Sequence, residues 1–365
     1  MPVLDDYQRL SSADPSNMLQ DIRSLADHCT ETWAKVRDIQ LPPDYSRVDA
    51  IVFTGMGGSA MIGDVLASLI GSTSPLPFIV SRGYELPKFV GPRTLVIASS
   101  HSGETEETIT SFKAAHAAGA KLLGLGTGGS LQALAEQWNA PFLRYDFAGQ
   151  PRAAFGYAFV TLLGAAYALD LLPDPSAAIE EACALLHELH ETIGPDAPTS
   201  RNPAKQLALE LHGHIPYVYA GPLLAKLAHR WKNQLNENSK SWAGWDVLPE
   251  LNHNTVASYE FPEVWSQARI ILLRSSSEGA RMLQRMDITA QLLAQRGIAC
   301  SIVQAQGESA LAQMFWTAHF SDYVSYYLAA LYGTNPTEIE AISQLKEQLQ
   351  RAPEQYSDLA AEVGA

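Results

Sequence analysis

Short apolar runs alternate with helix-like stretches along the first part of the chain. Each run is rich in β-branched residues, ends in a turn that contains glycine or serine, and precedes residues of helical composition. Strands and helices that alternate in this way predict an α/β fold with a doubly wound, mainly parallel sheet and helices on both faces. The expected strands are residues 49–53, 78–82, 94–98, 121–125 and 141–145.

The second half of the chain repeats this pattern less regularly. Strands are expected at 215–219, 269–273 and 299–303, and helices at 223–237 and 309–332. The second of these strands leads into a serine-rich turn and a helix, an order that also occurs in the first half. We therefore interpret the region as a second copy of the same domain, with a degenerate ligand turn.

These patterns divide the chain into an N-terminal helical segment, a first α/β domain, connecting helices with a linker, a second α/β domain, and a C-terminal helix with a tail. The expected bounds are 1–40, 41–150, 151–203, 204–335 and 336–365. One amphipathic helix is expected within 15–38. The connecting helix at 157–171 is almost wholly apolar, so we expect it to be buried between domains or subunits.

Composition narrows the classes of partner. The chain has 25 Lys and Arg against 39 Asp and Glu, a net charge of −14, which disfavours nucleic acids and anionic membranes as partners. Its three cysteines, Cys29, Cys183 and Cys300, lack metal-ligand spacing. The sequence also lacks a signal pattern and a long apolar run, so we expect a cytoplasmic location.

Residues 99–108 read Ser-Ser-His-Ser-Gly-Glu-Thr-Glu-Glu-Thr and join an expected strand to an expected helix. A helix N-terminus offers free backbone N–H groups and a dipole that favours an anion. Simple helix capping is the alternative, but it needs one or two hydroxyls, and here Ser100, Ser102 and Thr105 crowd together with a further serine. The turn therefore predicts a phosphate site.

A second ligand turn follows the first strand, with Gly57, Gly58 and Ser59 leading into a helix. Its glycines let the backbone approach a ligand closely. The spacing also permits the dinucleotide fingerprint, with Ala60 at the third position. However, the next strand, 78–82, ends without the acidic residue that would bind a ribose, so we expect no dinucleotide cofactor.

Polar residues are dense at 233–254. Glu237 falls at the end of an expected helix, where the macrodipole disfavours its charge and tends to raise its pKa, as suits a base that works near neutrality. His253 lies between two asparagines that can fix its tautomer, so it is a candidate proton shuttle. A solvated helix end and an exposed loop are the alternative reading of these residues.

Five motifs in this order resemble the bifunctional phosphoglucose/phosphomannose isomerases, which are built from two sugar isomerase (SIS) domains. They are Gly-Met-Gly-Gly-Ser, the Ser-x-Ser-Gly-x-Thr turn, Pro-Arg, Asn-Glu-Asn-x-Lys and Asn-His-Asn, and the resemblance spans about residues 50 to 350. It implies an enzyme that interconverts glucose 6-phosphate, and also mannose 6-phosphate, with fructose 6-phosphate through an enediolate. No metal or cofactor is implied.

The resemblance also implies roles for individual residues. Substrate phosphate would be held by Gly57, Gly58, Ser59, Ser100, Ser102 and Thr105. Glu237 would move the proton between C1 and C2, and Arg152 would stabilise the enediolate. His253 would assist ring opening from the partner subunit of a homodimer, and Lys346 would lie at the site.

Two departures and two alternatives stay open. His101 and Glu104 replace an aromatic residue and an asparagine in the serine turn, and we expect Glu104 to cap the helix and face solvent. Thr255 and Tyr259 stand where the family often has an acidic residue and a tryptophan, which leaves sugar specificity undecided. A non-catalytic phosphosugar-binding protein and an isomerase of a different phosphosugar are the alternatives; Glu237 favours the enzyme, because a binding module has no use for a base.

Overall fold

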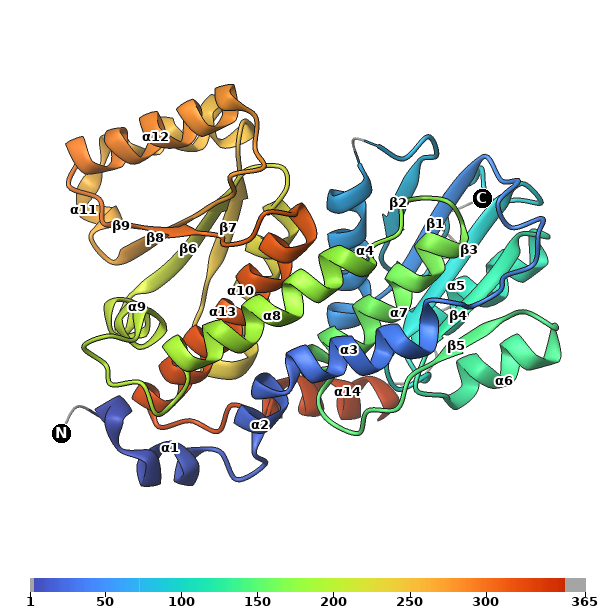
Figure 1. Ribbon diagram of the computed structural model, residues 1–365, viewed down its shortest axis with the longest axis horizontal. Coiled ribbons are helices and arrows are strands. Elements are labelled where there is room, and N and C mark those ends of the chain that lie inside the picture. The colour runs from blue at the N-terminus through green and yellow to red at the C-terminus, as the bar shows by residue number, and fades with distance from the viewer. Residues whose placement is uncertain (1–2, 72, 352–365) are drawn as a thin grey trace.

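The computed structural model describes residues 3–71 and 73–351 and contains two parallel sheets joined by a layer of helices (Figure 1). The first sheet has five strands in the order β2-β1-β3-β4-β5. They are β1 (Ala50–Gly55), β2 (Phe78–Ser81), β3 (Thr94–Ser100), β4 (Lys121–Gly126) and β5 (Phe142–Arg144). All five were expected from the sequence, and the parallel α/β fold class is confirmed.

Strand order reverses between β1 and β3, which lie side by side in the sheet. Gly55, the last residue of β1, pairs with Ser99 near the end of β3. The turns after these two strands therefore leave the same edge of the sheet at neighbouring points. In doubly wound sheets this reversal at the carboxyl edge is where ligands bind.

Both faces of the first sheet are covered by helices, so its central strands are buried throughout. Alternate residues point to opposite faces: Phe53 and Ile97 pack in one core cluster, and Val52 and Val96 pack in another. The covering helices are α4 (Gly57–Ile70) and α7 (Phe155–Ala168) on one face and α5 (Glu106–Ala117) and α6 (Gly129–Gln137) on the other.

The second sheet has four parallel strands in the order β7-β6-β8-β9. They are β6 (Ile215–Ala220), β7 (Gly244–Val247), β8 (Ala268–Arg274) and β9 (Cys300–Gln304). Strand β7 was not expected, because its Gly-Trp-Asp-Val sequence is short and half-buried and has no run of β-branched residues. Helices α11 (Pro262–Trp265) and α12 (Ala280–Gln295) lie against one face of this sheet.

The layer between the sheets is built from long helices (Figure 1). They are α3 (Leu25–Val36), α8 (Ser176–Ile193), α10 (Ala225–Ser239) and α13 (Ala310–Tyr332), and the shorter α9 (Pro203–Leu211) packs against α13. Helix α13 is buried over almost its whole length, because every side of it meets another element. The apolar α7 lies at the contact between the two halves, as expected. The ring of Phe159 on α7 packs against that of Phe315 on α13, with 5.5 Å between the ring centres.

The N-terminal segment differs from the single helix expected over 15–38. It contains α1 (Tyr7–Ala13) and α2 (Met18–Arg23), and Ser24 separates α2 from α3. Short 3-10 helices occur at Val3–Asp5 (η1), Pro151–Ala153 (η2), Glu250–His253 (η3) and Thr255–Glu260 (η4). Helix α14 (Glu340–Arg351) ends the described chain, and the expected tail after it lies outside the described residues.

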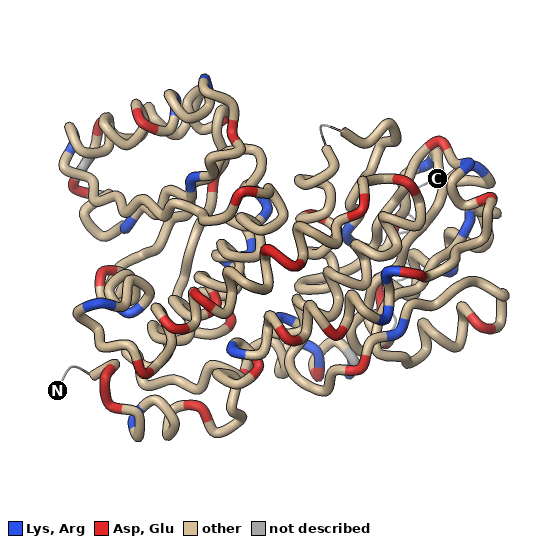
Figure 2. Tube along the Cα trace, in the orientation of Figure 1, with Lys and Arg blue, Asp and Glu red and all other residues tan. Residues whose placement is uncertain are grey.

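Two properties of the structure concern the distribution of charge and the hydropathy of the helices. Figure 2 shows Lys and Arg spread over both halves of the molecule among the acidic residues. Among the described residues, no helix combines the length and apolar character needed to cross a membrane.

Candidate active site

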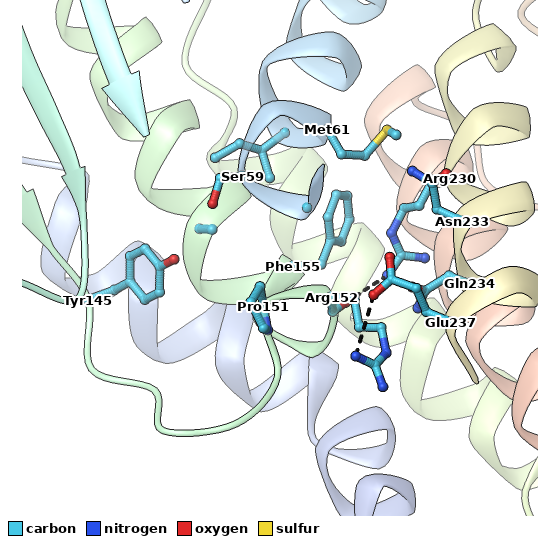
Figure 3. A pocket seen from close by; sticks show the side chains of 13 residues that line it. Ser59, Met61, Tyr145, Pro151, Arg152, Phe155, Arg230, Asn233, Gln234 and Glu237 are labelled. Carbon is cyan, nitrogen blue, oxygen red and sulfur yellow. Dashed lines mark hydrogen bonds and ion pairs between the residues drawn. The ribbon is translucent and has the colours of Figure 1, made fainter. Parts of the chain in front are cut away.

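A cavity lies between the two halves of the molecule (Figure 3). The first half contributes the first turns of α4, Tyr145, η2 and α7, and the second half contributes α10. The lining residues are Gly58, Ser59, Met61, Ile62, Tyr145, Pro151, Arg152, Phe155, Ala158, Arg230, Asn233, Gln234 and Glu237. Four of the residues that the sequence proposes for binding or catalysis thus border one space. They are Gly58, Ser59, Arg152 and Glu237, and they come from three separate segments.

The glycine turn and the serine turn meet beside this cavity. Ser59 Oγ accepts a hydrogen bond from the backbone N–H of His101 at 3.0 Å, which joins the two turns. Gly57 begins α4 with φ of +51°, in the left-handed region that favours glycine. Gly58 follows within the first turn of α4 and lies against the backbone of Pro151.

The hydroxyls of the serine turn form a compact group. Ser100 is fully buried; its Oγ lies 2.9 Å from Thr105 Oγ1 and accepts from Gly103 N at 3.0 Å. Ser102 is exposed, and its Oγ accepts from Glu104 N at 3.2 Å. Thr105 is the N-cap of α5 but makes no side-chain cap hydrogen bond. Capping of α5 by Thr105 therefore does not account for the turn.

Gly103 fixes the shape of this turn. Its φ is +73°, and a Cβ built on it would lie 1.9 Å from the carbonyl oxygen of Gly128. The serine turn therefore packs directly on the turn that follows β4, at a distance that only glycine allows.

Glu104 caps a helix, but not α5. Its carboxylate accepts from the backbone N–H and the hydroxyl of Ser130, each at 2.7 Å, in the first turn of α6. These hydrogen bonds, the one from the Ser130 hydroxyl first, lower the pKa of Glu104. The carboxylate is therefore engaged by the neighbouring turn, where its charge favours the start of α6.

His101 connects the serine turn to the cavity wall. Its Nδ1 lies 3.1 Å from Tyr145 Oη, and its Nε2 lies 3.2 Å from the carbonyl oxygen of Gly149. A carbonyl only accepts, so neutral His101 carries its proton on Nε2 and Nδ1 accepts from Tyr145. Burial lowers the pKa of His101, which favours this neutral form.

Arg152 and Glu237 lie next to each other in the lining of the cavity (Figure 3). Nη1 of Arg152 lies 3.5 Å from Oε2 of Glu237, and the arginine side chain is 3% exposed. Burial raises the pKa of Glu237, while the positive charge of Arg152 is the first of several that oppose the rise. The structure thus adds desolvation to the helix-end effect expected from the sequence.

The guanidinium of Arg152 is held from several sides. Nε donates to Asn238 Oδ1 at 2.7 Å, and Nη2 donates to the carbonyl oxygens of Pro336 and Thr337 at 2.6 and 2.8 Å. Nη1 also donates to Gln150 Oε1 at 3.3 Å. Every guanidinium nitrogen has a protein partner, so the position of Arg152 is set by three separate segments.

Sequence reasoning missed Arg230 and Gln234, which support α10, and gave Lys240 no role beyond its place in the Asn-Glu-Asn-x-Lys motif. Arg230 makes a buried, two-point ion pair with Asp322 of α13 at 2.7 and 3.1 Å, and Gln234 donates to the same carboxylate. Lys240 ends α10 with φ of +57° and donates to the carbonyl oxygens of Glu237, Asn238 and Asn335. A charged residue on the buried face of an expected helix could have indicated Arg230 from the sequence. Its partner Asp322 lies 92 residues further along the chain and cannot be identified from sequence spacing.

Six expected site residues do not line the cavity within one chain. Four of them, Gly57, Ser100, Ser102 and Thr105, belong to the two turns that Ser59 joins beside the cavity, and the other two are His253 and Lys346. His253 ends η3 and is exposed, and Lys346 is exposed on α14. The roles of all ten expected site residues stay predictions, including those of the four that line the cavity. Across residues 3–71 and 73–351, no group of three or more His, Cys, Asp or Glu side chains has the arrangement of a metal site.

Comparison with known proteins also indicates one α/β domain of the same kind in each half of the chain. Residues 44–138 match the SIS domain family, and residues 200–349 match the family described as the bacterial phospho-glucose isomerase C-terminal SIS domain. The crystal structure of a hypothetical protein from Thermus thermophilus has the same fold, with a TM-score of 0.73 and 19% identity, and the match covers 96% of this chain and 94% of that one.

Two curated relatives extend along nearly the whole chain. The bifunctional phosphoglucose/phosphomannose isomerase of Caldicellulosiruptor bescii is 37% identical over 336 residues, covering 91% of this chain and 98% of that protein. The protein of the same name from Aquifex aeolicus is 34% identical over 309 residues, covering 84% of this chain and 92% of its own. This chain belongs to the bifunctional phosphoglucose/phosphomannose isomerase family.

Proposed function

We propose that this protein is an isomerase that interconverts glucose 6-phosphate and mannose 6-phosphate with fructose 6-phosphate. The observation that carries the proposal is the pair formed by Glu237 and Arg152 in a cavity that Ser59 also borders. Aldose-ketose isomerisation moves one proton between adjacent carbons, so it needs a carboxylate base and a nearby positive charge. We expect the enzyme to act in the cytoplasm, without a cofactor.

The two turns at the switch point of the first sheet would bind the phosphate. Ser59, Ser100 and Thr105 place hydroxyls beside the start of two helices, and the backbone N–H groups of Gly57 and Gly58 lie in the same turn region. Ser102 is more exposed and would contact the phosphate from the solvent side. Because Glu104 is held by Ser130, its charge is directed toward α6.

Glu237 would take the proton from C2 of the aldose and return it to C1 of the ketose. A pKa above the ordinary carboxyl value suits a group that must accept and then release a proton. Arg152 would stabilise the negative oxygen of the enediolate intermediate. Its 3.5 Å contact with Glu237 is the longest of its hydrogen bonds and is the one that a substrate oxygen would replace.

Ring opening needs a second proton-transfer group, and we assign it to His253 of a partner subunit in a homodimer. Its exposed place on η3 leaves it free to enter another chain's cavity. Lys346 on the exposed α14 would join the same site. The apolar residues Ile342, Leu345 and Leu349 are exposed on one face of α14, which a second chain would cover.

The activity is tested by coupled assays of the purified protein on glucose 6-phosphate and mannose 6-phosphate, side by side. We expect turnover of both. Turnover of glucose 6-phosphate alone would remove the mannose activity from the proposal. Binding of fructose 6-phosphate without any turnover would instead support a phosphosugar-binding protein.

The shared site is tested by mixing two inactive variants, Glu237→Gln and His253→Ala. If His253 acts in the partner's cavity, each mixed dimer has one site with both residues intact. About a quarter of the wild-type activity should then return when the two are unfolded and refolded together in equal amounts, because about half of the dimers are mixed. Absence of any recovery would show that both residues act within one chain.

A further inference from the structure

The second half of the molecule contains a serine turn in the place that the phosphate turn has in the first half. Strand β8 ends at Arg274 and continues into Ser275, Ser276 and Ser277. β8 lies beside β6, and Ala220 at the end of β6 pairs with Leu273. The corresponding pair in the first sheet joins Gly55 and Ser99, so both serine turns leave a carboxyl edge next to a glycine turn.

The hydroxyls of this second turn are already occupied. Gln313 of α13 is fully buried, and its Oε1 accepts from Ser275 Oγ at 2.5 Å and from Ser276 N at 3.2 Å. Its Nε2 donates to the hydroxyls of Ser276 and Ser277 at 2.9 and 3.1 Å. One amide group therefore fills the space on which three serines converge.

The glycine turn beside it is occupied by a carboxylate. Oε1 of Glu278 accepts from the backbone N–H of Leu223, in the turn after β6, at 2.9 Å. A Cβ built on Gly221 would lie only 2.6 Å from that oxygen, so the absence of a side chain at this position is what admits the carboxylate. An anionic oxygen thus rests against a glycine turn, as a phosphate oxygen does in such turns.

Neither side chain caps its own helix, and the Glu278 carboxylate meets a backbone N–H at the start of α10, as the Glu104 carboxylate does at the start of α6. Glu278 precedes α12, whose N-cap is Gly279, and its carboxylate reaches across to the neighbouring turn instead of to the first turn of α12. Helix α13, which carries Gln313, is capped separately by Ser309. Two side chains from different segments therefore converge on the same sheet edge without capping their own helices.

We propose that the carboxyl edge of the second sheet is a phosphate site that the chain fills with its own side chains, Glu278 in place of the anion and Gln313 on the serine hydroxyls. Its ligand class, once it is opened, is inorganic phosphate or a phosphomonoester. A closed second site leaves one phosphosugar position per chain, so substrate is not held away from Glu237. The closed site itself goes beyond the isomerase activity and does not depend on it, and only its consequence for Glu237 rests on the proposed function.

The test is to open the site and count bound phosphate. Glu278→Ala removes the carboxylate from the glycine turn, and Gln313→Ala removes the amide while the carboxylate remains. Glu263→Ala, at an exposed position in the same half of the chain, is the matched control. Binding of labelled inorganic phosphate is measured by equilibrium dialysis on each full-length protein.

We expect Glu278→Ala, alone or combined with Gln313→Ala, to bind about one more phosphate per chain than the wild-type protein binds, because the repelling charge is gone. Gln313→Ala alone and Glu263→Ala should bind the wild-type number. A folded double variant that binds no additional phosphate overturns the proposal. The number of phosphates that the wild-type chain binds reports on the proposed phosphate site of the first domain. A failure of that proposal is therefore distinguished from a failure of this one.

Stability gives a second readout if a variant folds poorly. Each protein is refolded and then heated with and without phosphate, at constant ionic strength. Phosphate should raise the Tm or the refolded yield of Glu278→Ala more than it does for Glu263→Ala, since the anion replaces the missing carboxylate. Equal effects on the two variants would contradict the proposal.

Discussion

Nη1 of Arg152 lies 3.5 Å from Oε2 of Glu237, although the two residues are 85 positions apart. Arg152 belongs to η2, which follows the first sheet, and Glu237 to the last turns of α10, which precede β7 of the second. The base and the cation that we assign to isomerisation therefore meet only when the two halves of the chain are packed together. Each half alone would hold one member of the pair.

Glu237→Gln keeps the size of the side chain but removes the base. We expect kcat to fall by about 10²- to 10⁴-fold, the usual contribution of a positioned general base. Binding of fructose 6-phosphate should change little, since the phosphate turns are untouched. Isothermal titration and the coupled assay separate the two effects. Glu188→Gln, at an exposed position of α8, is the control, and full turnover by Glu237→Gln would refute the assignment.

The acid limb of the pH profile should follow Glu237. The base works when it is deprotonated, so kcat/KM should fall as the pH drops through its pKa, which burial raises above the ordinary value of 4.5. Arg152 lowers this pKa, so Arg152→Gln should move the limb to higher pH as well as reduce the rate. A limb that stays in place or moves to lower pH in the variant would show that another group titrates.

Gly103→Ala should impair substrate binding more than catalysis. The added Cβ would meet Gly128 O at 1.9 Å, and φ of +73° is strained for alanine, so the serine turn must shift. We expect a raised KM for fructose 6-phosphate and a nearly unchanged kcat. Gly91→Ala, where a Cβ would have only ordinary contacts, should leave both constants unchanged. A lower kcat at unchanged KM would contradict the anchoring role of this turn.

Asp322→Asn should destabilise the protein strongly. It leaves the buried Arg230 without its carboxylate, and removal of one partner from a buried ion pair costs about 3–5 kcal/mol. The free energy of unfolding is measured by urea denaturation. Asp38→Asn breaks an exposed pair with Arg37 and should have no measurable effect. Equal stability of both variants would show that the Arg230 pair is dispensable.

Local patterns were sufficient for most of the elements. The five strands of the first sheet were placed to within a residue or two, because each is an apolar run bounded by turn residues, and the central strands β1 and β3 are buried on both faces. Strand β7 was missed because Gly244–Val247 has no such run and is a strand only through its pairing with β6. The break at Ser24 was also missed, since the apolar spacing continues across it.

The sequence alone determined which residues are chemically suited to bind a phosphosugar and move a proton. They are a glycine-rich turn and a hydroxyl-rich turn, each at the end of a strand, a carboxylate at a helix end, and an arginine in a connecting segment. These are local features, because backbone conformation and residue type at neighbouring positions decide them. The roles of these residues stay predictions, and so do those of His253 and Lys346, which do not line the cavity of their own chain.

Only the tertiary structure decided how these residues are held and what surrounds them. It turned Glu104 toward Ser130, joined Arg152 to the carbonyls of Pro336 and Thr337, and closed the second serine turn with Gln313. Each of these contacts joins segments far apart in the chain. Their partners are chosen by the packing of helices and sheets, and no spacing along the sequence records that choice.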